Sequence, residues 1–176
     1  MIQFEKTVKF KKLVPEAVVP MRAHESDAGY DIVATSKQYD EHGNVVYGTG
    51  LAVEIPHGYA AFVYPRSSNR ETNLILTNSV GIIDSGYRGE IKAIFHSVNS
   101  SLNFMHLLKA WLREYIPGLK SHKQKNVRIV SLGSEYNVGD RIGQLVVMPV
   151  PRVEFIEVDE LSDSDRGKDG YGSTGK

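Results

Sequence analysis

Short segments rich in β-branched and aromatic residues recur along this chain, and this pattern restricts its fold more than any other feature. The segments are 51–55, 59–64, 73–77, 90–98, 127–132, 141–150 and 152–158. Pro56, His57 and Gly58 separate the first two segments as a turn would, and Glu41 to Asn44 is typical of a turn between strands. The pattern favours an all-β sandwich, barrel or jelly roll over an alternating β/α chain.

One region departs from this pattern. Between Leu102 and Ile116 the apolar residues follow a helical period, which predicts an amphipathic helix that ends at Pro117 and Gly118. Residues 100–130, called the basic segment below, contain six Lys and Arg against one Glu. The basic segment therefore carries a charge of +5 in a chain whose formal net charge is zero.

Length and composition exclude several classes of protein. A chain of 176 residues is expected to form one domain. The absence of cysteine excludes a disulfide scaffold, a zinc–thiolate site and a cysteine nucleophile. Equal numbers of basic and acidic residues argue against a general nucleic-acid coat protein. No apolar run approaches the roughly 20 residues of a membrane helix, and the first residues lack a signal-peptide core, so we expect a cytoplasmic protein without membrane contact.

Two segments that follow strands carry residue types suited to chemistry. In Pro65–Ser68, an arginine beside two hydroxyls can bind a phosphate through charge-assisted hydrogen bonds, although the same residues also occur in ordinary turns. In Gly81–Gly89, three glycines surround Asp84 and Tyr87. An aspartate there is either a general base towards water or the side chain that closes an Asx turn.

The C-terminal tail has a composition that fits either a phosphate-binding loop or a solvated end. Residues 166–175 combine glycines, two hydroxyls, Arg166 and Lys168, without the spacing of a P-loop. Tyr171 is able to stack on a base. The six histidines show no metal-ligand spacing.

In this order, these segments resemble the five motifs of the trimeric dUTP diphosphatases (dUTPases). Ala28–Asp31 is similar to the first motif and Pro65–Ser68 to the second. The third and most specific is Asn78–Gly89, with the sequence NSVGIIDSGYRG. Arg141–Gln144, followed by LVVMPV, resembles the fourth, and RGKDGYGSTG at 166–175 resembles the fifth. The resemblance covers nearly the whole chain apart from the basic segment.

The resemblance implies a jelly-roll-like β barrel that assembles as a homotrimer and hydrolyses dUTP to dUMP and pyrophosphate. Water attacks the α-phosphorus, and Mg²⁺ is the expected cofactor, held mainly by the substrate phosphates and water rather than by protein ligands. Asp84 matches the aspartate that orients and deprotonates this water. Asp31 matches an aspartate tied to the magnesium waters and an arginine network. The residues matched to substrate binding are Arg66, Ser67, Ser68, Asn78, Gly81, Ile82, Ile83, Tyr87, Lys92, Gln144, Arg166, Tyr171, Gly172, Ser173 and Thr174.

Each part of the substrate has its own motif in this scheme. Asn78 and the backbone that follows it read the uracil edge, and Tyr87 packs under the deoxyribose. The second motif and Gln144 bind phosphates, and Lys92 makes a backbone contact. The barrel is expected to span residues 1–161, with an insert at about 100–130, and residues 162–176 form a flexible arm that closes the site.

The chain also departs from the family pattern, and two other functions were weighed. Ser68 stands where the second motif usually has glycine, and Asp169-Gly170-Tyr171 replaces Gly-Gly-Phe in the fifth. Some bacteriophage members carry an insert like the basic segment, which fits a phage origin and a host-cytoplasm location. A dCTP deaminase of the same fold needs a glutamate where this chain has Ile94. A regulatory protein would act through the basic segment, which is suited to an acidic partner or nucleic acid.

Overall fold

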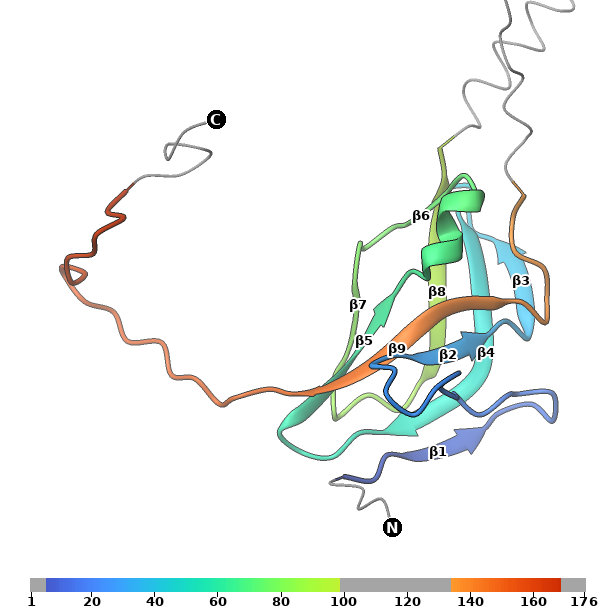
Figure 1. Ribbon diagram of the computed structural model, residues 1–176, viewed down its shortest axis with the longest axis horizontal. Coiled ribbons are helices and arrows are strands. Elements are labelled where there is room, and N and C mark those ends of the chain that lie inside the picture. The colour runs from blue at the N-terminus through green and yellow to red at the C-terminus, as the bar shows by residue number, and fades with distance from the viewer. Residues whose placement is uncertain (1–5, 99–133, 169–176) are drawn as a thin grey trace, which may run out of the picture.

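The computed structural model describes residues 6–98 and 134–168, which form two antiparallel β-sheets packed face to face (Figure 1). The first sheet has the order β1-β4-β8-β6, with β3 also paired to β4. Its strands are β1 (Lys9–Lys12), β3 (Ser36–Tyr39), β4 (Val45–Glu54), β6 (Leu74–Leu76) and β8 (Glu90–Ser97). The second sheet has the order β2-β9-β5-β7. Its strands are β2 (Tyr30–Val33), β5 (Tyr59–Tyr64), β7 (Gly81–Ile83) and β9 (Arg141–Pro149).

Strands that follow one another in the chain mostly lie in opposite sheets, so the connections cross between the layers as in a jelly roll. The predicted all-β class is confirmed. A short 3-10 helix, η1 (Ser67–Glu71), follows β5.

The core lies between the two sheets and is centred on aromatic side chains. Tyr47 on β4 and Phe95 on β8 are fully buried, and their ring centroids lie 5.8 Å apart in an edge-on arrangement. Tyr136 completes the cluster at 6.0 Å from Tyr47 and 5.9 Å from Phe95. Such aromatic contacts stabilise a core beyond the area they bury.

The strand predictions hold where the sequence has a clear local pattern. The segment 59–64 coincides with β5, 90–98 contains β8, and 141–150 contains β9. The turn at Pro56 to Gly58 is confirmed, with Gly58 at a φ of +80° and the Tyr59 N–H donating to the Pro56 carbonyl. The turn before Asn44 is also confirmed and joins β3 to β4.

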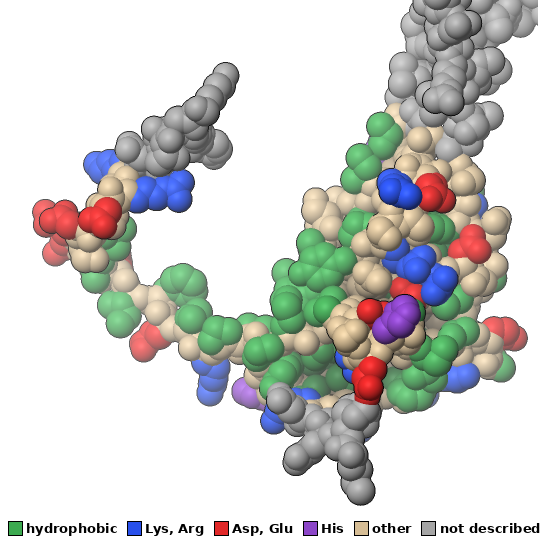
Figure 2. Space-filling model, viewed as in Figure 1, with side chains coloured by type: hydrophobic (Ala, Val, Ile, Leu, Met, Phe, Trp, Pro, Cys, Tyr) green, Lys and Arg blue, Asp and Glu red, His purple; other side chains and the backbone are tan. Residues whose placement is uncertain are grey.

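The prediction of a strand at 152–158 is wrong for the single chain. After β9, residues 151–168 leave the sheets as an extended arm without strand pairing (Figures 1 and 2). A strand requires a neighbour for its backbone hydrogen bonds, and none lies along this segment. Phe155, Ile156 and Leu161 on the arm are 95%, 73% and 88% exposed.

Several predictions concern residues outside the described ranges. They are the helix at 102–116, the basic segment, the strand at 127–132, and the fifth-motif residues Tyr171, Gly172, Ser173 and Thr174. Within residues 6–98 and 134–168, no helix is long and apolar enough to cross a membrane.

Candidate active site

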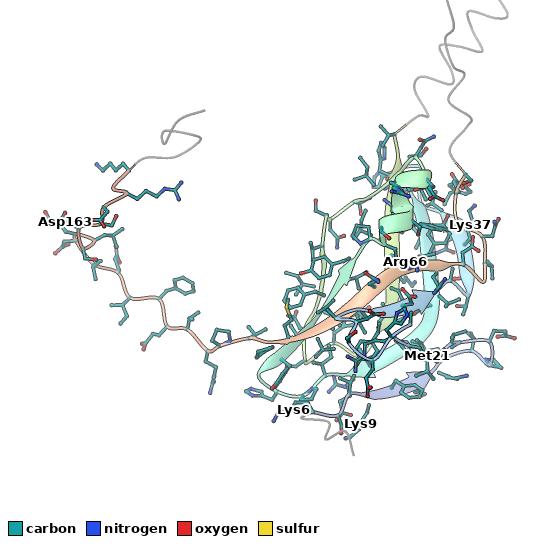
Figure 3. All side chains as sticks on the ribbon, viewed as in Figure 1. Lys6, Lys9, Met21, Lys37, Arg66 and Asp163 are labelled. Carbon is teal, nitrogen blue, oxygen red and sulfur yellow. The ribbon has the colours of Figure 1, made fainter. Side chains whose placement is uncertain are left out.

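Three of the predicted motifs meet at one end of the second sheet, where a carboxylate lies between two arginines. Asp31 on β2 is paired in register with Gln144 on β9. Arg66, two residues after β5, donates from Nε to Asp31 Oδ1 at 2.8 Å, and Arg141 Nη1 lies 3.0 Å from Oδ2. The Asp31 side chain is only 12% exposed and that of Arg66 20%. The first, second and fourth motifs are therefore assembled within one chain, around Arg66 (Figure 3).

This arrangement leaves the cluster with excess positive charge. One carboxylate faces two guanidinium groups, so these three side chains together carry a net charge of about +1, and Glu71, Glu135 and Asp140 line the adjoining cleft. Charge-assisted hydrogen bonds from such groups suit phosphate oxygens. The sequence places Arg141 inside the fourth motif but indicates no role for it. Its pairing with Asp31 depends on the register of β2 against β9, which no local pattern predicts.

The second-motif turn carries the predicted hydroxyls next to this cluster. Ser67 is exposed, and Ser68 accepts a hydrogen bond from Arg66 Nη1 at 3.1 Å. Asn69 donates from Nδ2 to the Leu74 carbonyl at 2.8 Å, and its own carbonyl accepts from the Thr72 hydroxyl at 2.7 Å. The absence of the usual glycine is therefore accommodated by a turn that Asn69 closes.

The Gln144 side chain lies against Gly29 of the first motif. A Cβ added to Gly29 would lie 3.0 Å from Gln144 Cβ and 3.3 Å from its Oε1. The small residue at position 29 therefore lets the glutamine side chain pack flat against the first motif. Gly29 belongs to the first motif, but the sequence alone indicates no role for it.

A cleft of about 320 Å³ adjoins this cluster on the side of residues 134–137. Arg66, Ser68 and Arg141 line it together with Tyr136, and Glu135 and Asp140 add carboxylates. Burial raises the pKa of Tyr136, while the Ser68 hydroxyl and the Arg66 charge act in the opposite direction. Burial also acts to raise the pKa of Glu135, but hydrogen bonds from Lys37 and Tyr39 outweigh it and leave this pKa lowered.

The third-motif residues lie on the same sheet but extend towards its other end. In β7, Gly81 is paired with Val63 and Ile83 with Ala61 of β5. β7 is the last strand of its sheet, so its outer edge presents unpaired backbone groups among the described residues. Ile82 is 65% exposed on this strand and Ile83 is buried.

Asp84 is exposed and begins the turn that follows β7. The Tyr87 N–H donates to the Asp84 carbonyl at 3.0 Å, and the Tyr87 hydroxyl donates to the Glu90 carbonyl at 3.1 Å. The Tyr87 ring lies over Gly89, where any side chain would collide with it. Lys92 on β8 contacts Glu90 at 3.5 Å.

The single chain does not bring Asp84 to the arginine cluster. Ala61 and Tyr64 of β5 are separated by about 10 Å along an extended strand. Asp84 comes directly after Ile83, which is paired with Ala61, and Arg66 comes two residues after Tyr64. Asp84 and Arg66 therefore lie beyond opposite ends of this part of β5. Arg166 is on the arm, three residues after Asp163, which lies far from Arg66 in Figure 3.

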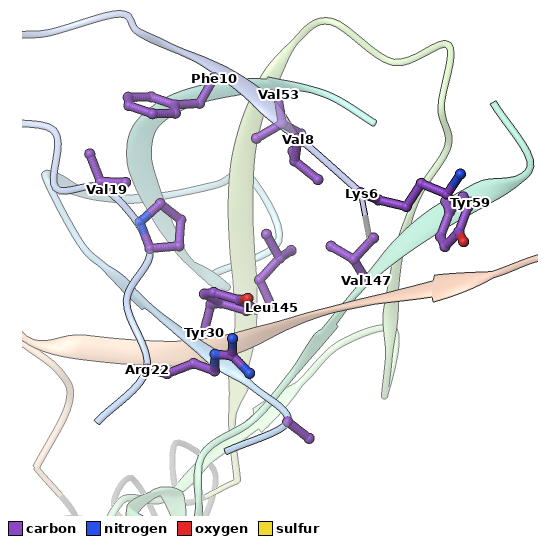
Figure 4. A pocket seen from close by; sticks show the side chains of 12 residues that line it. Lys6, Val8, Phe10, Val19, Arg22, Tyr30, Val53, Tyr59, Leu145 and Val147 are labelled. Carbon is purple, nitrogen blue, oxygen red and sulfur yellow. The ribbon is translucent and has the colours of Figure 1, made fainter. Parts of the chain in front are cut away.

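A larger cavity of about 430 Å³ has a mostly apolar lining (Figure 4), and none of the predicted phosphate-binding residues lines it. Phe10, Tyr30 and Val147 are among the residues that line it. At its rim, Arg22 lies 4.7 Å from the centre of the Tyr30 ring and Lys6 lies 5.7 Å from that of Tyr59. It adjoins β1, which pairs with β4 on one side.

Metal binding was tested against the described side chains. In residues 6–98 and 134–168, no group of three or more His, Asp or Glu residues is placed to hold a metal ion. Both oxygens of Asp31 already contact arginines.

Comparison with known proteins identifies the family. The dUTPase family model matches residues 15–104 and 122–175. The deoxyuridine 5'-triphosphate nucleotidohydrolase of Thermobifida fusca (strain YX) is 37% identical over 170 residues, which cover 96% of this chain and 78% of that protein. That of Clostridium tetani is 34% identical over 174 residues, covering 98% and 99%. The chain belongs to the dUTPase family, as the five motifs predicted.

Solved structures of phage dUTPases share the fold. The Staphylococcus bacteriophage 80alpha dUTPase with dUPNHPP has a TM-score of 0.71 and 29% identity, covering 97% of this chain and 99% of that one. The phage phi11 enzyme, described with its species-specific insert, has a TM-score of 0.62 and 25% identity, covering 90% and 100%. A mutant of the phi11 enzyme, with a TM-score of 0.63, 25% identity and coverage of 88% and 98%, is described with a structural Mg(II) ion. The unmatched residues 105–121 of the family comparison fall inside the basic segment.

Proposed function

We propose that this protein hydrolyses dUTP to dUMP and pyrophosphate. The observation that carries the proposal is the Asp31–Arg66–Arg141 cluster beside Ser68 and Gln144, in a chain whose relatives are named for this reaction. The linked phosphates of a nucleoside triphosphate require concentrated positive charge, which the two arginines supply. The hydroxyls and N–H groups of η1 add donors at the same place.

The open edge of β7 is the proposed uracil site. Uracil presents alternating carbonyl and N–H groups, which match the free backbone groups of an edge strand. Asn78, three residues before the start of this strand, adds a side-chain amide with both a donor and an acceptor. Tyr87, held over Gly89, is 46% exposed and offers a flat ring for the deoxyribose.

Asp84 is the proposed general base. It takes a proton from water as the water oxygen bonds to the α-phosphorus, and the bond from this phosphorus to the bridging oxygen of the β-phosphate breaks. Pyrophosphate leaves with that oxygen. When bound through the substrate phosphates and water, Mg²⁺ supplies charge neutralisation of the leaving group. The described residues fit this mode of binding better than a cage of protein ligands, because Asp31 is already occupied by arginines.

The separation of Asp84 from Arg66 supports a homotrimer in which neighbouring chains complete each site. The arm supports the same assembly, since Val153, Phe155 and Ile156 are 69–95% exposed in the single chain. We infer that the arm of one chain lies against β1 and the apolar cavity of the next. Pairing with β1 of the next chain would give the 152–158 segment the neighbouring strand that it lacks. The same placement would direct the end of the arm towards another chain's site.

Two other functions were considered. A deaminase requires a proton-transferring side chain at position 94, but Ile94 on β8 is apolar and half-buried. The hypothesis of a binding protein that acts through the basic segment depends on the charge of that segment alone. It stays a prediction from the sequence.

The direct test incubates the purified protein and Mg²⁺ with dUTP, dCTP, dTTP and UTP separately, and identifies the products. We expect dUMP and pyrophosphate from dUTP and little turnover of the other three. Release of orthophosphate, or conversion of dCTP to dUTP, would overturn the proposal.

A further inference from the structure

The second-motif turn has little means of holding its own shape. η1 contains five residues, none of them buried, and its N-cap residue Arg66 makes no side-chain cap hydrogen bond to the helix. Ser67 and Ser68 must nevertheless present their hydroxyls in a fixed direction if they are to bind phosphate. Local hydrogen bonds of Asn69 with Thr72 and Leu74 close the turn, and a contact from the core is needed to fix it relative to the two sheets.

Asn69 is the residue through which such a contact reaches the turn. Its Nδ2 donates to the Leu74 carbonyl, and its Oδ1 accepts from the Thr72 hydroxyl at 3.1 Å. The same Oδ1 accepts a hydrogen bond from the Tyr136 hydroxyl at 3.2 Å. This last bond is the long-range one, since Tyr136 lies 67 residues away in the sequence.

Tyr136 is itself firmly held. It is 7% exposed, its ring packs against Tyr47 and Phe95, and its carbonyl accepts from the Tyr47 hydroxyl at 2.9 Å. Ser68 and Arg66 line the same cleft as Tyr136. A rigid core residue thus points its side-chain hydroxyl at the turn.

We propose that Tyr136 is a positioning residue for phosphate recognition. Its hydroxyl fixes Asn69, and with it Ser67 and Ser68, in the geometry that the triphosphate requires. This inference rests on the proposed function but adds a residue outside the five motifs' assigned roles. A phenylalanine could fill the core equally well, so the hydroxyl is explained by its contact with the turn rather than by packing.

The test is Tyr136→Phe, which removes the hydroxyl and retains the ring. Losing one neutral hydrogen bond corresponds to about a twofold to tenfold change in affinity. We expect the dissociation constant for the non-hydrolysable analogue dUpNHpp to rise by this factor, while the inhibition constant of deoxyuridine, which has no phosphates, stays unchanged. The melting temperature should stay within a few degrees.

Tyr39→Phe is the matched control. It removes a phenol whose hydroxyl donates to Glu135 Oε2 at 2.7 Å rather than to a residue of η1. Glu135 is the neighbour of Tyr136 in the chain. We expect its dUpNHpp affinity to equal that of the wild type. The double variant Tyr136→Phe with Asn69→Ala should lose less than the two single losses combined, because both remove the same bond.

The outcomes separate the two proposals. Wild-type protein that does not turn over dUTP would overturn the proposed function. Active wild-type protein with an unchanged dUpNHpp constant in Tyr136→Phe would overturn the positioning role. Equal weakening of dUpNHpp and deoxyuridine would also overturn it, since that pattern reports a general structural loss.

Discussion

At the scale of single residues, charge pairing determines what the site can bind. Asp31 alone would repel phosphates, but with the two arginines at 2.8 and 3.0 Å the three side chains together carry a net charge of about +1. The carboxylate also fixes the orientation of the planar guanidinium groups. Glycines contribute at the same scale by letting Gln144 and Tyr87 pack closely against the backbone.

The first prediction concerns Asp84. Asp84→Asn retains the shape of the side chain but removes its basicity. General-base assistance is worth roughly 10²–10⁴-fold, so kcat should fall by that factor, which corresponds to about 3–5 kcal/mol. The affinity for dUpNHpp should stay near that of the wild type. Glu41→Gln, an exposed acid in the β3–β4 turn, is the control and should leave kcat unchanged. Near-normal turnover of Asp84→Asn would contradict the assignment.

The second prediction concerns Gly29. In Gly29→Ala the new methyl group must displace Gln144, whose side-chain atoms lie 3.0–3.3 Å from it. If the methyl group moves Gln144 away from the phosphates, the loss of one hydrogen bond of about 1 kcal/mol should make dUpNHpp bind roughly fivefold more weakly. Deoxyuridine inhibition provides the internal control. If titration calorimetry gives an unchanged constant for dUpNHpp, Gln144 does not contribute to phosphate binding.

At the scale of secondary structure, most strands follow from local pattern, while the exceptions follow from long-range pairing. β5 and β8 were predictable because each is a short run rich in β-branched and aromatic residues. β1 (KFKK) is exposed at all four positions and exists only through its pairing with β4. The opposite failure occurs at 152–158, where a strand-like sequence has no partner strand among the described residues of its own chain.

The candidate site shows the same division. Asp31, Arg66 and Gln144 were identified from motifs, and the structure brings them together. The contact between Arg141 and Asp31, and that between Tyr136 and Asn69, depend on register and packing across more than 60 residues of sequence. No local pattern encodes those contacts.

The third prediction concerns the anchoring of β3. Glu135 accepts from the Tyr39 hydroxyl at 2.7 Å and contacts Lys37 at 2.8 Å, and these bonds hold its pKa below the ordinary value of 4.5. A carboxylate with a lowered folded-state pKa stabilises the fold above its unfolded pKa, and this stability is lost as the pH falls through the lower value. Glu135→Gln should therefore be less stable than the wild type at pH 7, with the difference shrinking below about pH 4.5.

Urea unfolding at several pH values measures this effect. The control is Glu54→Gln, because Glu54 pairs with Lys9 at 2.8 Å on an exposed surface and should contribute little. A constant stability difference between Glu135→Gln and wild type from pH 7 to pH 3 would mean that the Glu135 charge has no stabilising role.

The fourth prediction concerns the end of the arm. Deleting residues 166–176 removes an arginine, a tyrosine and a glycine-rich stretch, and Arg166 to Lys168 lie exposed on the arm. If this segment closes over the phosphates as proposed, turnover should collapse, whereas the melting temperature should barely change. Full activity of the truncated protein would show that this part of the tail has no role in catalysis.

At the scale of the whole molecule, the described part of a single chain keeps the pieces of the proposed site apart. Its phosphate-binding cluster and its proposed base lie beyond opposite ends of a strand span of about 10 Å. Its arm exposes large apolar side chains, and an apolar cavity lies beside β1. The proposed assembly of three copies would account for these features together.

The last prediction tests this assembly through Phe155, which is 95% exposed in the single chain. If its ring is buried against a neighbouring chain, Phe155→Asp places a charge in an apolar contact, which typically costs several kcal/mol per site. Light scattering should then give a mass near one chain instead of three, and dUTP turnover should fall with the fraction of trimer. Glu154→Gln, the adjacent exposed residue, should stay trimeric and active. Because the substitution lies outside the proposed site, restored turnover at high protein concentration would tie activity to assembly, whereas a fully active monomer would show that one chain completes the site alone.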